Sequence, residues 1–366
     1  MTEATFRVAF AGPHVTIQDA GRPGLMRFGV PASGPMDRRS FGIANAALGN
    51  APDAPGIEVS RGGLQLECLS GHVTLASAGG GFIVQRDREK FGSWQVLTIT
   101  AGQKLAIRPG PWGSWTYLCF AGRLHAPQWL GSHATHASSG LGGGKLATGQ
   151  ILTITTADVP PDRTGPIVCP IWARPRHRLH CVLGPQDRFF SPEALKDFTS
   201  LPYRLTDAYD RMGVRLRGPA LVPDAALSIP SEPILRGAVQ VSGDGVPTVL
   251  LSDHQTTGGY PKIATILADD LDGFVQCRPH DVVQLSPITP ADAAALARTR
   301  ARSFAAYLLN FARIRYADHR SAPPAEVLLC SATLPELALH PLSPAAPTGP
   351  AMARQSRPIR AAPDRH

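Results

Sequence analysis

The chain has 366 residues, of which 43% are hydrophobic and 17% are charged, and its formal net charge is +8. This balance is typical of a folded globular protein and excludes a largely disordered one. The sequence contains no run of about 18 apolar residues, the length that a membrane-spanning helix needs. The 36 glycines and 35 prolines predict many turns and few long helices.

The scattered cysteines and the N-terminal sequence argue against secretion. The six cysteines are widely spaced and form no C-x-x-C pair: Cys68, Cys119, Cys169, Cys181, Cys277 and Cys330. We therefore expect free thiols rather than a zinc site or a disulfide framework, and no bound metal. No secretory signal pattern is visible, and we expect a cytoplasmic location without membrane contact.

The positive charge is concentrated in residues 291–366, which hold ten arginines and five acidic residues. The rest of the chain lacks a stripe of basic residues interleaved with aromatics, so we expect no nucleic-acid partner.

The first 50 residues predict two short strands, a turn-rich loop and a helix. The strands are Phe6–Phe10 and Val15–Ile17, and the loop 19–24 follows. Arg22 in that loop either clamps a carboxylate or phosphate, or pairs with Asp19.

Asp37 is placed to cap a helix over residues 38–48, which Gly49 ends. The start of that helix, with Ser33 nearby, would form a corner that favours anions. Asn45 lies within the helix and faces either a ligand or solvent.

Short β-rich segments separated by Gly or Pro follow from residue 56 to 156, which predicts a barrel or sandwich. Neither glycine triplet has the spacing of a phosphate-binding P-loop. A proline-rich linker over 157–178 leads to a second set of strands. There, Asp210 and Arg211 predict a turn closed by their ion pair, and Gln240, just before an Asp-Gly turn, faces either a ligand or solvent.

The most informative segment is the signature loop, from Asp253 to Pro261, which follows a strand ending at Leu251. It contains a carboxylate, an imidazole, an amide, several hydroxyls and the pair Gly258 and Gly259, whose backbone a ligand can approach closely. A loop that only caps itself is the alternative.

The C-terminal part predicts an amphipathic helix over 289–320, with Phe304, Leu308 and Phe311 on one face. Packing on the body of the protein is its simplest role. Residues 321–366 are rich in Pro and Ala, and we expect disorder there.

Three blocks together resemble one family. They are D-H-Q-T-T-G-G-Y-P at 253–261, T-I-Q-D-A-G-R at 16–22 with G-V-P-A-S-G-P-M-D at 29–37, and D-R-M-G-V-R-L-R-G at 210–218. The family comprises the C-subunit of prokaryotic 5-oxoprolinase, KipA, and part of the urea amidolyase carboxyltransferase (allophanate hydrolase subunit 2). Two positions depart from its pattern: Ser242 replaces a proline, and His133 stands where the family has an arginine.

The resemblance implies a mainly β fold of two cyclophilin-like β-barrel domains with few short helices. The domains would cover 1–156 and 179–288, joined by the linker 157–178 and followed by the helix 289–320 and the tail 321–366.

It also implies an enzyme subunit that works with subunit-A-like (lactam-hydrolase) and subunit-B-like (KipI-type) partners. Such a complex hydrolyses ATP to open the 5-oxoproline lactam to glutamate. The alternatives are a carboxyltransferase that moves a carboxyl group from biotin to urea, and a KipA-type regulatory binding protein.

For such a small amide substrate, Asp253 is the expected acceptor or general base, with Gln255 and Thr256 as orienting groups. The other residues expected to bind the substrate are Thr257, Gly258, Gly259, Tyr260, Gln240, Asn45, Ser33, Asp37 and Arg22.

Overall fold

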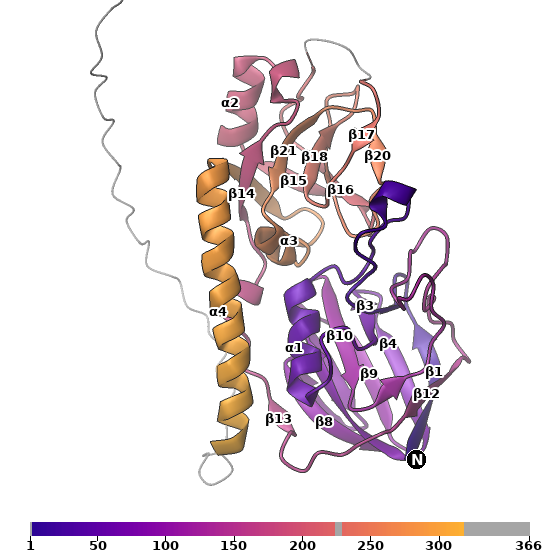
Figure 1. Ribbon diagram of the computed structural model, residues 1–366. Coiled ribbons are helices and arrows are strands. Elements are labelled where there is room, and N and C mark those ends of the chain that lie inside the picture. The colour runs from indigo at the N-terminus through magenta and orange to yellow at the C-terminus, as the bar shows by residue number, and fades with distance from the viewer. Residues whose placement is uncertain (1, 224–228, 318–366) are drawn as a thin grey trace, which may run out of the picture. The chain divides into compact units, whose positions relative to one another are not determined.

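The mainly β prediction is confirmed by a computed structural model, which describes residues 2–223 and 229–317. Its strands form two lobes, drawn in indigo to magenta and in magenta to orange in Figure 1. The predicted disordered tail 321–366 lies outside the described residues. None of the helices in the described ranges is long and apolar enough to cross a membrane.

The first lobe consists of two sheets. The seven-stranded sheet has the order β11 (Arg123–Leu124), β12 (Ile151–Thr155), β1 (Glu3–Ala11), β4 (Leu64–Ser70), β9 (Lys104–Trp112), β6 (Gly81–Arg86), β7 (Glu89–Gly92). The six-stranded sheet has the order β13 (Gly165–Pro166), β8 (Gln95–Thr100), β5 (His72–Ala78), β10 (Trp115–Phe120), β3 (Gly56–Ser60), β2 (Thr16–Gln18).

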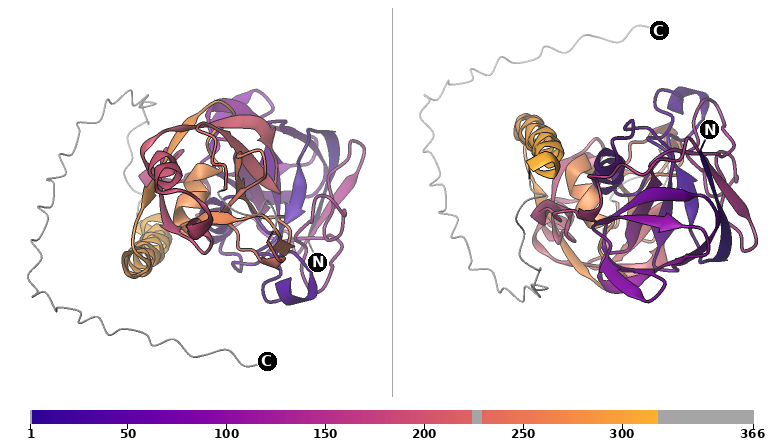
Figure 2. Two further views of the ribbon diagram at one scale, coloured as in Figure 1. Left: turned by 90° about the horizontal axis from the view of Figure 1, so that it is seen from above. Right: turned by 90° about the horizontal axis from the view of Figure 1, so that it is seen from below.

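The second lobe is a closed barrel, which the left view of Figure 2 shows from above. Its strands follow the order β14 (Arg178–Leu183), β21 (Lys262–Ile266), β18 (Ala238–Val241), β19 (Pro247–Leu250), β16 (Gly213–Arg217), β15 (Tyr203–Tyr209), β22 (Val282–Pro287). A separate pair, β17 (Glu232–Pro233) and β20 (Thr257–Gly258), includes part of the signature loop. Two helices accompany the barrel, α2 (Pro192–Ser200) and α3 (Ala268–Phe274).

Strand β10 is buried on both faces and connects the two hydrophobic cores. Leu118 and Phe120 face the core between the two sheets. Tyr117 and Cys119, one residue out of phase, join a second core that continues into the barrel. Because this second core spans both lobes, the described residues fall within one compact unit, and the domain limits at 156 and 178 stay a prediction.

Helix α1 (Arg38–Leu48) covers the predicted residues and lies against the outer face of the six-stranded sheet. Asp37 accepts a hydrogen bond from the Ser40 amide and caps the first turn. Gly49 ends the helix in the left-handed conformation, with φ of 76°. Local signals therefore determine both ends of this helix.

The predicted linker is not a bare connection. Its strand β13 extends the six-stranded sheet by pairing with β8. Trp172, in the short turn Ile171–Ala173, supports helix α4 (Pro290–Ala317), with its ring 5.6 Å from those of Phe304 and Tyr307. Helix α4 also contacts α1 and β14. Phe304 and Leu308 thus pack on the body, and the Phe311 side chain lies outside the described residues.

We expect F304A to loosen helix α4. Removing the ring loses edge-on contact with Trp172 and the cation–π contact with Arg39, at a cost of about 1–2 kcal/mol. Amide hydrogen exchange in α4 should accelerate roughly 5- to 30-fold. L309A is the matched control, since Leu309 is 63% exposed. Equal exchange in the two variants would contradict docking through Phe304.

Candidate functional site

The signature loop leaves β19 and returns as β21, and its middle is fixed by the pairing of β20 with β17. Its first residues are buried, whereas several of the later ones are not. Asp253 is 1% exposed, whereas Thr257 and Tyr260 are exposed. The loop is therefore held in the protein interior at Asp253, and its later residues are accessible to solvent.

Asp253 is one end of a buried ion-pair network with Arg211 and Glu58. The Nε and Nη2 atoms of Arg211 each lie 2.9 Å from a carboxylate oxygen of Asp253. The same guanidinium donates to Glu58 on β3 and to the Gly34 carbonyl. The Ala137 amide donates to Asp253 at 2.9 Å. One arginine of the second lobe thus joins three segments of the chain.

The ionisation of this network follows from its pairing. Burial alone would raise the pKa of Asp253, but the positive charge of Arg211 and its hydrogen bonds outweigh burial and lower the pKa. Burial would likewise lower the pKa of Arg211, and the two carboxylates raise it instead. Asp253 is therefore an ionised acceptor whose oxygens are already occupied, which argues against the expected role as a general base.

The predicted ion pair between Asp210 and Arg211 is wrong. Asp210 accepts hydrogen bonds from the Met212 and Gly213 amides and closes its own turn, while Arg211 turns inward to Glu58 and Asp253. The available signal in the sequence was a charged Glu58 inside β3, a strand that is buried throughout. A buried carboxylate requires a partner.

Two buried polar atoms near Asp253 make no hydrogen bond to any described residue. They are Nη1 of Arg22 and Oγ of Ser33. Ser33 lies close enough to help lower the pKa of Asp253, and it adopts a left-handed backbone with φ of 53°. Arg22 donates to the Trp129 and Ala134 carbonyls rather than to Asp19. Both predicted residues are therefore near Asp253.

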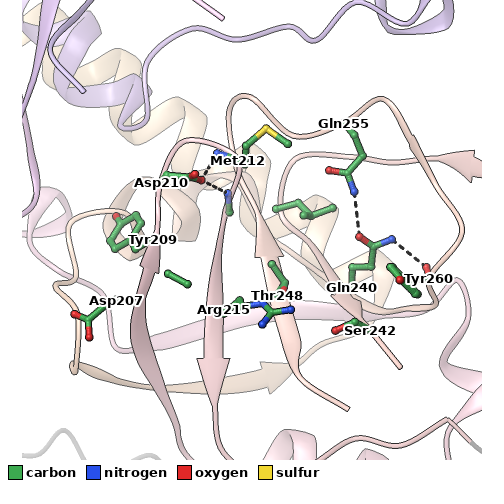
Figure 3. A pocket seen from close by; sticks show the side chains of 13 residues that line it. Asp207, Tyr209, Asp210, Met212, Arg215, Gln240, Ser242, Thr248, Gln255 and Tyr260 are labelled. Carbon is green, nitrogen blue, oxygen red and sulfur yellow. Dashed lines mark hydrogen bonds between the residues drawn. The ribbon is translucent and has the colours of Figure 1, made fainter. Parts of the chain in front are cut away.

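A cavity of about 490 Å³ lies against the barrel, and its lining includes Asp210 and Met212, the chain neighbours of Arg211. Figure 3 shows Gln240, Gln255 and Tyr260 on one side of it, and Asp210 and Tyr209 on the other. Three of the predicted site residues are thus brought together in one pocket.

The pocket presents a chain of amides. Nε2 of Gln255 lies 3.2 Å from Oε1 of Gln240, whose Nε2 lies 3.3 Å from the Tyr260 carbonyl (Figure 3). Within the described part of the chain, Oε1 of Gln255 accepts no hydrogen bond. It is therefore available to accept an N–H group from a ligand.

Gly258 supports this arrangement by its lack of a side chain. A Cβ atom there would lie 2.6 Å from Ile234 and 2.9 Å from Nε2 of Gln240. The glycine thus gives Gln240 room, a role different from the expected close approach of a ligand. The carbonyl oxygens of Thr256 and Gly259 accept from the Ile234 and Ile229 amides.

Two predicted residues lie in other surroundings, near α1. Asn45 bonds to the Ala54 carbonyl and to Asn50, so it holds the loop after the helix. Asp37 accepts from Ser40 and from Gln276 of the second lobe. Burial and the nearby Asp272 raise the pKa of Asp37 to about 7.

The family model and the similar proteins point to the same family. The family described as carboxyltransferase domain, subdomain A and B, matches residues 28–287. The 5-oxoprolinase C-subunit of Escherichia coli is 32% identical over 269 residues, covering 72% of this chain and 85% of that protein. The urea amidolyase of Lachancea kluyveri is 30% identical over 78% of this chain, which spans 17% of that protein.

A solved structure shows the same fold. The urea amidolyase of K. lactis superimposes with a TM-score of 0.75 at 24% identity, covering 84% of this chain and 20% of that one. The chain thus matches one portion of the much longer urea amidolyases and most of the length of the Escherichia coli protein.

Removal of Arg211 should be far more damaging than removal of its neighbour Arg215. R211A leaves two buried carboxylates without their cation, and we expect a loss of about 3–5 kcal/mol in the free energy of unfolding. R215A removes a half-exposed partner 3.8 Å from Asp244 and should cost less than about 1 kcal/mol. Urea denaturation compares the two; similar losses would contradict the network's central role.

Asp37 should make stability fall as pH rises. Its pKa is about 7 in the folded protein and roughly 3.9 in an unfolded chain. The folded state therefore holds the proton more tightly, and the resulting stability is present below the unfolded value and is lost as pH rises through 7.

D37N keeps a helix cap without the ionisation. The difference in unfolding free energy between D37N and wild type should therefore shift in favour of D37N from pH 5 to pH 8. The exposed Asp53 provides the control D53N. A difference that is independent of pH would contradict the raised pKa.

Proposed function

Because the chain belongs to the carboxyltransferase subdomain A and B family, we propose that it is a subunit of a 5-oxoprolinase-type complex. The complex uses ATP to open the 5-oxoproline lactam to glutamate. The proposal is supported by the relative in Escherichia coli, 85% of whose length this chain covers. Subunit-A-like and subunit-B-like (KipI-type) proteins are the proposed partners.

The observation that carries the proposal is the amide chain in the pocket. A lactam presents an N–H donor beside a carbonyl acceptor. The Gln255 side chain is complementary to this pair, since its free Oε1 can accept from the lactam N–H and its amide nitrogen can donate. Gln240 holds the Gln255 side chain, and the pocket of about 490 Å³ accommodates a compact molecule.

In this proposal Gln255 binds the substrate amide, Gln240 positions Gln255, and Tyr260 covers the open side. Asp253 and Arg211 hold the start of the loop in place. Opening the lactam adds water across the C–N bond, which leaves a carboxylate and an amine. The sequence has no P-loop pattern, and the residues that bind ATP are assigned to the partner subunits.

A second candidate is supported by the 30% identity to urea amidolyase. Urea also offers N–H groups to an acceptor, and the carboxyl group would then come from biotin carried by another domain. The two functions differ in their requirements: ATP turnover dependent on 5-oxoproline in one, and carboxylation of urea dependent on biotin in the other.

We expect Q255A to lower kcat/KM for 5-oxoproline about 10-fold in a complex reconstituted with the two partner subunits, since one hydrogen bond to the substrate is lost. Q85A, on β6 of the first lobe, is the matched control and should retain full activity. Glutamate formation and ATP hydrolysis are measured together.

Equal activity of Q255A and wild type would remove the pocket from the proposal. A wild-type complex without lactam-dependent turnover would contradict the 5-oxoprolinase function. Biotin-dependent carboxylation of urea would then identify a carboxyltransferase, and binding to the KipI-type partner alone would identify a regulatory protein.

A further inference from the structure

Three metal-ligating side chains that are far apart in the sequence meet where two barrel strands begin. They are His177, Cys277 and Asp281, and one donor atom of each lies within 4.8 Å of the others. His177 immediately precedes β14, Asp281 immediately precedes β22, and these strands pair in parallel. Cys277 follows α3. The strand pairing therefore fixes the ligands in one place.

The histidine keeps one ring nitrogen free. Its Nδ1 lies 2.9 Å from the Val282 carbonyl oxygen, which can only accept. Nδ1 therefore carries the proton, and Nε2 has a free lone pair. Histidines that bind metals commonly donate their other ring N–H to a carbonyl in this way. This observation is independent of the clustering.

The sulfur and the carboxylate are also placed for a cation. Cys277 is fully buried, and its sulfur lies within 4.8 Å of a carboxylate oxygen of Asp281. The thiol contacts two backbone carbonyl oxygens, that of Arg176 at 3.4 Å and that of Gly273 at 3.9 Å, both of them weak sulfur hydrogen bonds. The Arg278 amide holds Oδ2 of Asp281 at 2.8 Å. A divalent cation would displace the thiol proton to solvent and then balance the charges of the resulting thiolate and of the Asp281 carboxylate.

The neighbouring arginines are engaged elsewhere. Arg278 donates its side chain to the Gly110 and Gly113 carbonyls. Arg176 pairs with Asp270 at 3.1 Å. Neither of these guanidinium groups is therefore paired with Asp281 in place of a metal.

We propose that His177, Cys277 and Asp281 form a binding site for a transition-metal ion of the Zn²⁺ class. Nitrogen and sulfur ligands favour such an ion over Ca²⁺ or Mg²⁺. In a tetrahedral site, donor atoms lie roughly 3.5 Å apart, so the side chains close by about 1 Å. The exposed edge of His177 admits the ion and a water molecule as fourth ligand.

The site acts as a clasp for the lobe interface. Ser114 of the first lobe donates to the Cys277 carbonyl at 2.7 Å, and the adjacent Gln276 reaches Asp37 at 2.8 Å. A metal bound to Cys277 and His177 therefore secures the segment through which the second lobe contacts the first. This role does not depend on the substrate of the pocket.

Titration of the full-length, chelator-treated chain with Co²⁺ tests the site. We expect a thiolate-to-cobalt charge-transfer band that C277S abolishes and that C169S, at a half-buried cysteine elsewhere, retains. H177A should weaken Co²⁺ binding at least 10-fold. Zn²⁺ should compete for the site and raise the Tm of wild type more than that of H177A.

Because His177 is exposed, H177A remains informative even where C277S fails to fold. Circular dichroism confirms the fold of each variant. Absence of the band in the wild type, its persistence in folded C277S, or equal Co²⁺ affinity of H177A and wild type would overturn the proposal.

Discussion

The structure depends on one buried cation shared by two carboxylates. Arg211 bridges Asp253 of the signature loop and Glu58 of the first lobe, and all three side chains are at most 1% exposed. Removing such charges from water is costly, and each is tolerated only because the others are present. The cost makes the pairing specific: a shifted lobe would leave a buried charge unpaired. The network therefore sets how the loop of one lobe meets a strand of the other.

This constraint divides the signature loop into two parts with different roles. Its acid belongs to the framework, and its amide Gln255, two residues later, reaches the pocket. The conformation of the loop leaves little freedom, because Gly258 must lack a side chain for Gln240 to reach Tyr260. The same nine residues thus serve both the assembly of the lobes and, in the proposed function, the binding of a ligand.

Much of the fold could be predicted because its signals are local. Asp37 and Gly49 mark the ends of α1, and alternating residues mark strands such as β4. The pairing of Arg211 with Glu58 joins residues 153 apart. A charged residue inside an apolar strand indicates that Glu58 needs a partner, but the local sequence does not say which arginine supplies it. The same limit hides the cluster of His177, Cys277 and Asp281, since its spacing resembles no metal motif. The sequence indicates which residues are candidates for a site. Only the three-dimensional packing shows which of them hold the lobes together and which line the pocket.

The lobe interface contains two polar centres of opposite character. At one, Arg211 satisfies two carboxylates. At the other, Asp37 and Asp272 repel each other in a buried environment, and Arg236 near them keeps two nitrogens without hydrogen-bond partners among the described residues. The first centre holds the signature loop, and the second joins α1 to Gln276, the residue before Cys277. The second centre is the less satisfied of the two. A change of protonation there, or the proposed metal at Cys277, would therefore act on the interface at residues that do not line the pocket.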